Sequence, residues 1–68
     1  MARFKCTTRW SLGGRNFSKI VGKGESVHIN ADHVNDITPD MLKTAVETQL
    51  DKEYLNPQRL NDWTITRL

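Results

Sequence analysis

The clearest alternation of apolar and polar positions in this chain runs from residue 3 to residue 12. One parity is mainly apolar and consists of Phe4, Cys6, Thr8, Trp10 and Leu12. The other parity is polar and basic and consists of Arg3, Lys5, Thr7, Arg9 and Ser11. Because successive side chains of a strand point to opposite faces, this pattern predicts one strand with an apolar face and a basic face. We expect the rest of the chain to pack against the apolar face.

Two further strands are predicted after the first one. A Gly-Gly pair at 13–14 lies between two strand-like runs and predicts a hairpin turn into a strand over 15–21. The glycines within 22–25 indicate another turn, and alternation resumes over 26–31 as a third strand. The alternative is that 15–31 forms a single long strand, bulged at the glycines.

A helix is predicted to begin at Thr38, which has the residue type of an N-cap and is followed by Pro39 at the first helical position. Apolar residues then recur every three or four positions, at Met41, Leu42, Ala45, Val46 and Leu50. The helix should end within 51–54, before an Asn-Pro pair. Gln49 falls inside the apolar stripe, so it should lie at the sheet boundary or in a contact with a second subunit.

The C-terminal part predicts a short extra turn over 56–60 and a closing strand over 62–68. The element order is therefore β-β-(β)-α-β, which predicts an α+β fold: a small antiparallel or mixed sheet of three or four strands with one helix on one face. The connection into the last strand is long enough for a right-handed parallel crossover. The predicted core consists of Phe4, Trp10, Phe17, Val27, Ile29, Leu42, Val46, Leu50, Trp63 and Ile65.

Length and composition predict one small domain over residues 1–68, with a modest core because only 37% of the residues are hydrophobic. Cys6 is the only cysteine, so no disulfide can reinforce the core, and self-association is a reasonable expectation. The sequence contains no apolar run long enough to span a membrane and no apolar N-terminal signal segment. We therefore expect a cytoplasmic protein with no membrane contact.

Charge is distributed unevenly along the chain. Residues 1–24 contain six basic residues and no acid, whereas 25–68 contain eight acids and four basic residues. The predicted nucleic-acid contacts are these six basic residues, Arg3, Lys5, Arg9, Arg15, Lys19 and Lys23. The aromatics that would stack on bases are absent from this parity. The alternative is a solvated strand face whose charges protect a sheet edge from aggregation.

Other residues that could carry chemistry have simpler structural explanations. The segment 22–24 (Gly-Lys-Gly) lacks the remaining residues of a phosphate-binding loop and is interpreted as a turn. The three soft metal-ligand residues, Cys6, His28 and His33, show no paired spacing, so we predict no metal site. Asp32, Asp36 and Asp40 fit turn and helix-start chemistry. We therefore predict neither an enzyme nor a cofactor; an enzyme is an alternative only if a pocket brings His28 or His33 beside a carboxylate.

The sequence does not identify a function, because the fold class by itself does not assign one. The leading hypothesis is a non-enzymatic binding module that contacts nucleic acid through its basic hairpin face. The alternative is a homo-oligomeric or protein-partner-binding domain that uses a sheet edge or the helix. In that alternative, Trp10, Tyr54 and Trp63 would be the anchors if they are exposed.

Overall fold

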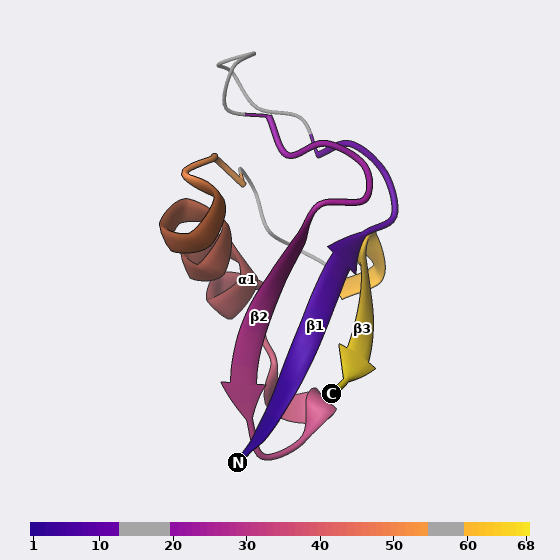
Figure 1. The fold of residues 1–68 in the computed structure, drawn as a ribbon, viewed down its shortest axis with the longest axis vertical. Helices are drawn as coiled ribbons and strands as arrows, with labels where there is room; N and C mark the ends of the chain where they lie inside the picture. The colour runs from indigo at the N-terminus through magenta and orange to yellow at the C-terminus, as the bar shows by residue number, and fades with distance from the viewer. Residues whose placement is uncertain (13–19, 55–59) are drawn as a thin grey trace.

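The computed structural model describes residues 1–12, 20–54 and 60–68. Its sheet has three strands, β1 (Ala2–Thr8), β2 (Ser26–Ala31) and β3 (Trp63–Arg67), in the order β2-β1-β3. Both outer strands pair with β1 in the antiparallel direction, so β2 and β3 run parallel to each other on either side of it. Figure 1 shows α1 (Pro39–Ala45) on the β2 side of this sheet. The predicted α+β class is confirmed, and the sheet is antiparallel rather than mixed.

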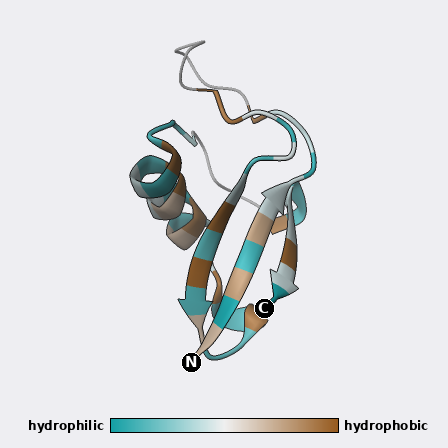
Figure 2. Cartoon of the chain, viewed as in Figure 1, coloured by the Kyte–Doolittle hydropathy of each residue, from teal (hydrophilic) through white to brown (hydrophobic). Residues whose placement is uncertain are grey.

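The central strand β1 has one buried and one exposed face. Phe4, Cys6 and Thr8 are 4%, 0% and 4% exposed, whereas the side chains between them lie toward solvent. The register places Cys6 opposite Val27 on one side and opposite Ile65 on the other. Apolar and polar residues consequently alternate along the strands (Figure 2), and the apolar positions meet on one face.

The first strand is shorter than its alternation predicts, ending at Thr8 instead of residue 12. After Thr8 the two arms of the hairpin separate around a turn at Lys23 and Gly24, and within the described residues they meet again at the isolated bridge between Leu12 and Val21. The return arm is therefore interrupted, and β2, over 26–31 as predicted, pairs directly with β1. The turn predicted at 13–14 and most of the strand predicted over 15–21 lie outside the described residues.

The helix begins where predicted. Thr38 is its N-cap, and the side-chain oxygen accepts a hydrogen bond from the Met41 backbone N–H at 3.3 Å. Helix α1 continues directly into the π-helical segment η3 (Val46–Leu50). The segment ends at Asp51, whose φ of 53° is left-handed and stops the helix. Two short 3₁₀ turns, η2 (Val34–Asp36) and η4 (Leu60–Asp62), flank this region and lead into it and into β3.

The helix and sheet enclose one apolar cluster. Its buried members include most of the predicted core: Phe4, Val27, Ile29, Leu42, Val46 and Trp63. Leu50 and Ile65 are only partly buried, and Phe17 lies outside the described residues. The buried residues also include several that are not in the predicted core, among them Leu12, Val21, Ile37 and Tyr54. The prediction for Trp10 was wrong, because 47% of its surface is exposed. The strand has already ended at Thr8, so the alternation no longer determines where this side chain points.

Candidate nucleic-acid interface

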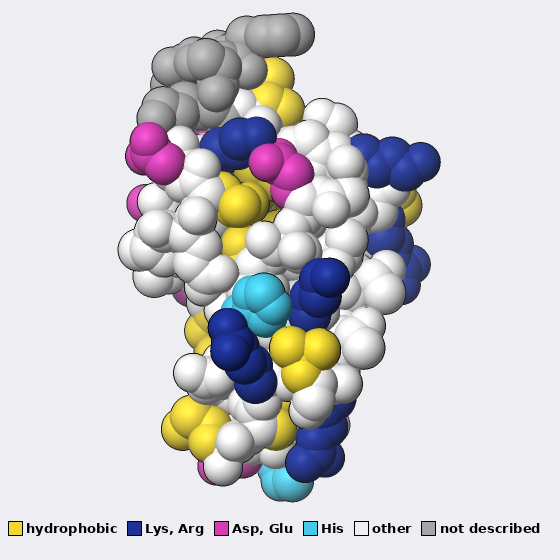
Figure 3. Space-filling view, viewed as in Figure 1, with side chains coloured by type: hydrophobic (Ala, Val, Ile, Leu, Met, Phe, Trp, Pro, Cys, Tyr) yellow, Lys and Arg dark blue, Asp and Glu magenta, His cyan; other side chains and the backbone are white. Residues whose placement is uncertain are grey.

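The face of the sheet opposite the apolar cluster carries the predicted basic side chains. Arg3 and Lys5 alternate with buried residues of β1 and are exposed. Lys5 lies in the register between His28 of β2 and Thr66 of β3. We call the surface formed by Arg3, Lys5, Thr7, Ser26, His28, Asn30, Thr64 and Thr66 the open face. Figure 3 shows lysine and arginine side chains around a histidine on this side of the molecule.

Acidic residues are absent from all three strands. The sequences of β1, β2 and β3 contain no aspartate or glutamate, and the acids lie in the connections and in the helical segment, which is α1 together with η3 (residues 39–50). Among the described residues, neither Arg3 nor Lys5 forms an ion pair with an acid. In the helical segment, by contrast, the basic side chain of Lys43 does have an acidic partner, because its Nζ lies 2.6 Å from the Glu47 carboxylate. The positive charge of the open face is therefore not neutralised by neighbouring side chains.

The other predicted contact residues are only partly brought together with Arg3 and Lys5. Arg9 is exposed just beyond the end of β1, where its backbone N–H donates to the Asp62 carbonyl at 3.0 Å. Lys23 is exposed in the turn that interrupts the hairpin. Arg15 and Lys19 lie outside the described residues. The open face itself is thus defined by β1, with Arg9 at its end.

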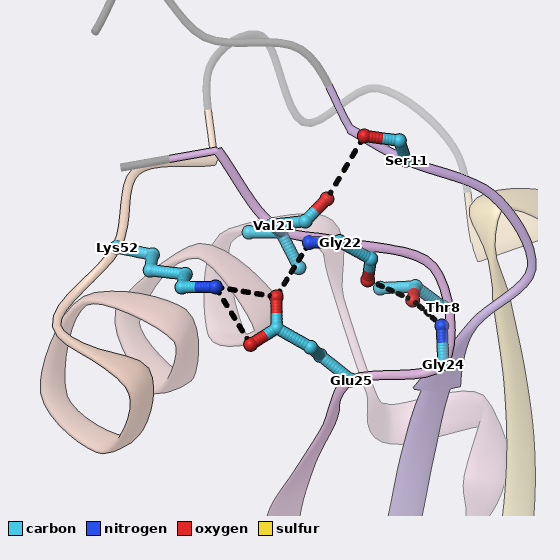
Figure 4. Close-up of polar contacts among 7 residues, drawn as sticks. All are labelled: Thr8, Ser11, Val21, Gly22, Gly24, Glu25 and Lys52. Carbon is cyan, nitrogen blue, oxygen red and sulfur yellow. Dashed lines mark hydrogen bonds and ion pairs between the residues drawn. The ribbon is translucent and has the colours of Figure 1, made fainter. Parts of the chain in front are cut away.

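The glycines around Lys23 form a structural turn, as predicted. The Gly24 N–H donates to the Thr8 hydroxyl oxygen at 2.8 Å, and this hydroxyl donates to the Gly22 carbonyl, also at 2.8 Å. The Gly22 N–H donates to the Glu25 carboxylate (Figure 4). Gly24 has a φ of 87°, a left-handed conformation that favours glycine. Both glycine amides therefore already have protein partners.

An ion pair fixes this turn to the end of the helical segment. Lys52 Nζ lies 2.7 Å from both carboxylate oxygens of Glu25 (Figure 4), and both side chains are partly buried. The hydrogen bond from Lys52 lowers the pKa of Glu25 below its ordinary value. The charge of Glu25, at the base of the hairpin, is consequently paired with Lys52 and contributes less negative potential to the open face.

Trp10 is held at the surface by a residue that sequence analysis did not single out. Its indole N–H donates to Asp62 Oδ1 at 3.1 Å, and the Tyr54 hydroxyl donates to Asp62 Oδ2 at 3.3 Å. Tyr54 in turn packs edge-on against Trp63, with ring centroids 5.7 Å apart. An exposed aromatic ring therefore does lie close in sequence to the basic residues. No local signal in the sequence links residues 10 and 62.

The remaining candidates behave as structural residues. Cys6 is fully buried, and burial raises the pKa of its thiol to about 11, so it packs as a small apolar group. Asp36 accepts a hydrogen bond from the His33 backbone N–H at 3.2 Å, which caps η2. Within the described ranges, no three histidine, cysteine or acidic side chains are grouped so that they could hold a metal ion.

Comparisons with protein-family models, curated proteins and solved structures found no match for this chain. In the part of the chain that the structure describes, no helix is long and apolar enough to cross a membrane.

Proposed function

We propose that this chain is a non-enzymatic binding module whose open face contacts the sugar–phosphate backbone of a nucleic acid. The observation that carries the proposal is the separation of charge between the two layers of the fold. The open face carries Arg3 and Lys5, and the three strands contain no acid, whereas the segment 32–51 contains five acids and one lysine. A surface with one sign of charge attracts the polyanionic backbone and orients the molecule toward it.

The chemistry of the open face suits phosphate contacts. Arg3 and Lys5 have no acidic partner among the described residues, so binding a phosphate would not require them to break an ion pair. The exposed side chains of Thr64, Thr66 and Asn30 surround them in the register and add neutral donors. Hydroxyl and amide side chains commonly contact phosphate and sugar, and such contacts position a protein without reading sequence.

The same face lacks the features of base recognition. Its strand positions contain no aromatic residue, so bases have no stacking platform between the strands. Trp10 supplies one exposed ring, at the end of β1 and beside Arg9. We therefore expect binding with little sequence preference, governed mainly by charge.

Salt-dependent binding tests this proposal. Anisotropy of a labelled single-stranded RNA and of a labelled DNA duplex would be followed between about 50 and about 200 mM salt. With Arg3, Lys5 and Arg9 each meeting one phosphate, the slope of log K against log salt should be about −2 to −3. Absence of binding at the lowest salt, or an affinity that does not change with salt, would overturn the proposal.

A further inference from the structure

The two edges of the sheet differ in how far other parts of the chain cover them. On the outer edge of β2, the Gln49 side chain accepts from the His28 N–H at 2.8 Å and donates to the His28 carbonyl at 2.7 Å. The helical segment packs against the same strand. This edge therefore cannot pair with another strand around His28 unless Gln49 is displaced.

Among residues 1–12, 20–54 and 60–68, no side chain bonds the outer edge of β3 in this way. The Leu68 N–H donates to Arg3 and the Arg9 N–H donates to the Asp62 carbonyl, so even-numbered residues of this ladder face β1. The backbone groups of Trp63, Ile65 and Arg67 consequently point outward. β3 is the outermost strand on the side away from α1 (Figure 1), and no strand in the described ranges pairs with this edge.

The sequence of β3 does little to discourage pairing. It reads Trp-Thr-Ile-Thr-Arg, which is rich in β-branched residues, has no proline or glycine, and has its only charge at the end. Beneath the strand lies a hollow of about 440 Å³, lined on one part by the apolar side chains of Phe4, Val34 and Ile65 and elsewhere by polar ones, Asp32, His33, Asn35 and Arg67. Val34 is 43% exposed. An added strand would therefore find both open backbone groups and room for an apolar side chain.

We propose that β3 pairs with β3 of a second copy of this chain, antiparallel and centred on Ile65, to form a continuous six-stranded sheet. This register places Thr64 opposite Thr66 of the other copy and lets the two Ile65 side chains meet at the hollow. Cross-strand threonine and apolar pairs of this kind are favourable. Six backbone hydrogen bonds then form, two at each of the pairs 63–67, 65–65 and 67–63.

Charge complementarity selects a second copy in the antiparallel direction. Each β3 has a basic end at Arg67 and an acidic neighbour, Asp62, at its other end. Antiparallel pairing brings the Arg67 end of one copy to the Asp62 end of the other, twice. Parallel pairing would instead bring the two Arg67 residues together.

The basic open faces do not prevent this association. The two copies of Lys5 would be three strand spacings apart, about 14 Å, which exceeds the screening length of about 8 Å at physiological ionic strength. The dimer would also join two open faces into one surface on the same side of the sheet. The proposal is nevertheless independent of nucleic-acid binding, because its contacts lie along the strand edge.

Sedimentation equilibrium tests the association. The mass should rise with concentration from 7.8 kDa toward twice that value. Ile65→Pro removes an outward N–H without removing a bond to β1, and Arg67→Glu opposes Asp62 with a like charge, so each should keep the chain monomeric. The matched control is Asn30→Pro, which removes an outward N–H on the β2 edge and should leave the association unchanged. Arg67→Glu decides the question if Ile65→Pro does not fold.

Disulfide trapping tests the register. Ile65→Cys should form a covalent dimer on mild oxidation, because the two residues at this position lie directly opposite each other. Thr64→Cys alone should not, since its opposite residue is Thr66. Buried Cys6 does not compete in the folded chain. A wild-type chain that remains monomeric at all concentrations, or association that survives both edge variants but is lost in Asn30→Pro, would overturn the proposal.

Discussion

The side-chain amide of Gln49 forms two hydrogen bonds with the backbone of a single residue, His28, on the outer edge of β2. Its oxygen accepts from the His28 N–H at 2.8 Å, and its nitrogen donates to the His28 carbonyl at 2.7 Å. The amide thus occupies the place that a neighbouring strand would take. Of the two locations expected for Gln49, the sheet boundary is confirmed.

Replacing Gln49 should weaken the contact between the helical segment and the sheet. Gln49→Ala removes both hydrogen bonds, which lie near solvent, so we expect the free energy of unfolding to fall by about 1 kcal/mol. Gln49→Glu can still accept from the His28 N–H, but its second carboxylate oxygen then faces the His28 carbonyl and repels it, so this variant should not recover the stability lost in Gln49→Ala. Urea unfolding measures both variants. Equal stability of Gln49→Ala and wild type would show that the contact contributes nothing.

Charge reversal on the open face should reduce nucleic-acid affinity. Arg3→Glu and Lys5→Glu each remove one phosphate contact, so each should make the slope of log K against log salt shallower by about 0.7 to 0.9. The matched control is Lys43→Glu, which makes the same charge change on the helical segment. Titration of labelled RNA at several salt concentrations measures all three. An equal loss in all three variants would point to net charge rather than to this face.

The hydroxyl of Thr8 should stabilise the base of the hairpin. It is buried and bonds both the Gly22 carbonyl and the Gly24 N–H. Thr8→Val keeps the shape but leaves these two backbone groups without the hydroxyl, so we expect a loss of about 1 to 3 kcal/mol in the free energy of unfolding. Thr8→Ser keeps the hydroxyl and is the control. If the Gly24 amide exchanges faster in Thr8→Val but not in Thr8→Ser, the loss of stability lies at the base of the hairpin.

The ion pair between Glu25 and Lys52 should make stability depend on pH. Lys52 lowers the pKa of Glu25 in the folded chain, so the contribution is present above the ordinary pKa of glutamate. It is lost as the pH falls through the lowered folded value. Glu25→Gln should therefore be less stable than wild type at neutral pH, with the difference shrinking in acid. Thermal unfolding of both proteins at neutral and at acidic pH measures this difference in stability. A difference that does not change with pH would contradict the prediction. Glu47→Gln, in the more exposed pair with Lys43, should change stability less than Glu25→Gln does, because solvent screens that pair.

Cys6 should react only when the chain opens. It is 0% exposed, and burial raises the pKa of its thiol to about 11, so little reactive thiolate is present at neutral pH. A thiol reagent at about pH 8 should modify the native protein slowly and the urea-unfolded protein at once. Rapid labelling of the native protein would mean that β1 is not sealed between β2 and β3. Above the ordinary thiol pKa, ionisation of Cys6 in the unfolded chain should lower the stability of the fold.

Local patterns in the sequence were sufficient to predict those features that depend on a single strand or helix. The alternation over 26–31 and the capping residue Thr38 predicted β2 and the helix start, because strand periodicity and capping depend on neighbouring residues only. The exposed Arg3 and Lys5 follow from the same alternation. The identity of a nucleic-acid partner stays a prediction.

Long-range contacts account for what the sequence did not reveal. Trp10 continues the alternation, but Thr8 bonds the interrupting turn and Asp62 holds the indole from 52 positions away. The hollow beneath β3 likewise depends on a distant segment, because residues 32–35 lie against Phe4 and Ile65 there. Packing between distant segments decides such positions, and it leaves no periodic trace in the chain.

The central position of β1 has a consequence for how the chain acquires its structure. Phe4 lies opposite Arg67, so the first strand is completed only by residues near the other end of the sequence. Contacts of such long range are made late and slow the folding of a small domain. A nascent chain that stalls before residue 63 would keep one side of its N-terminal strand unpaired and exposed to other chains during synthesis.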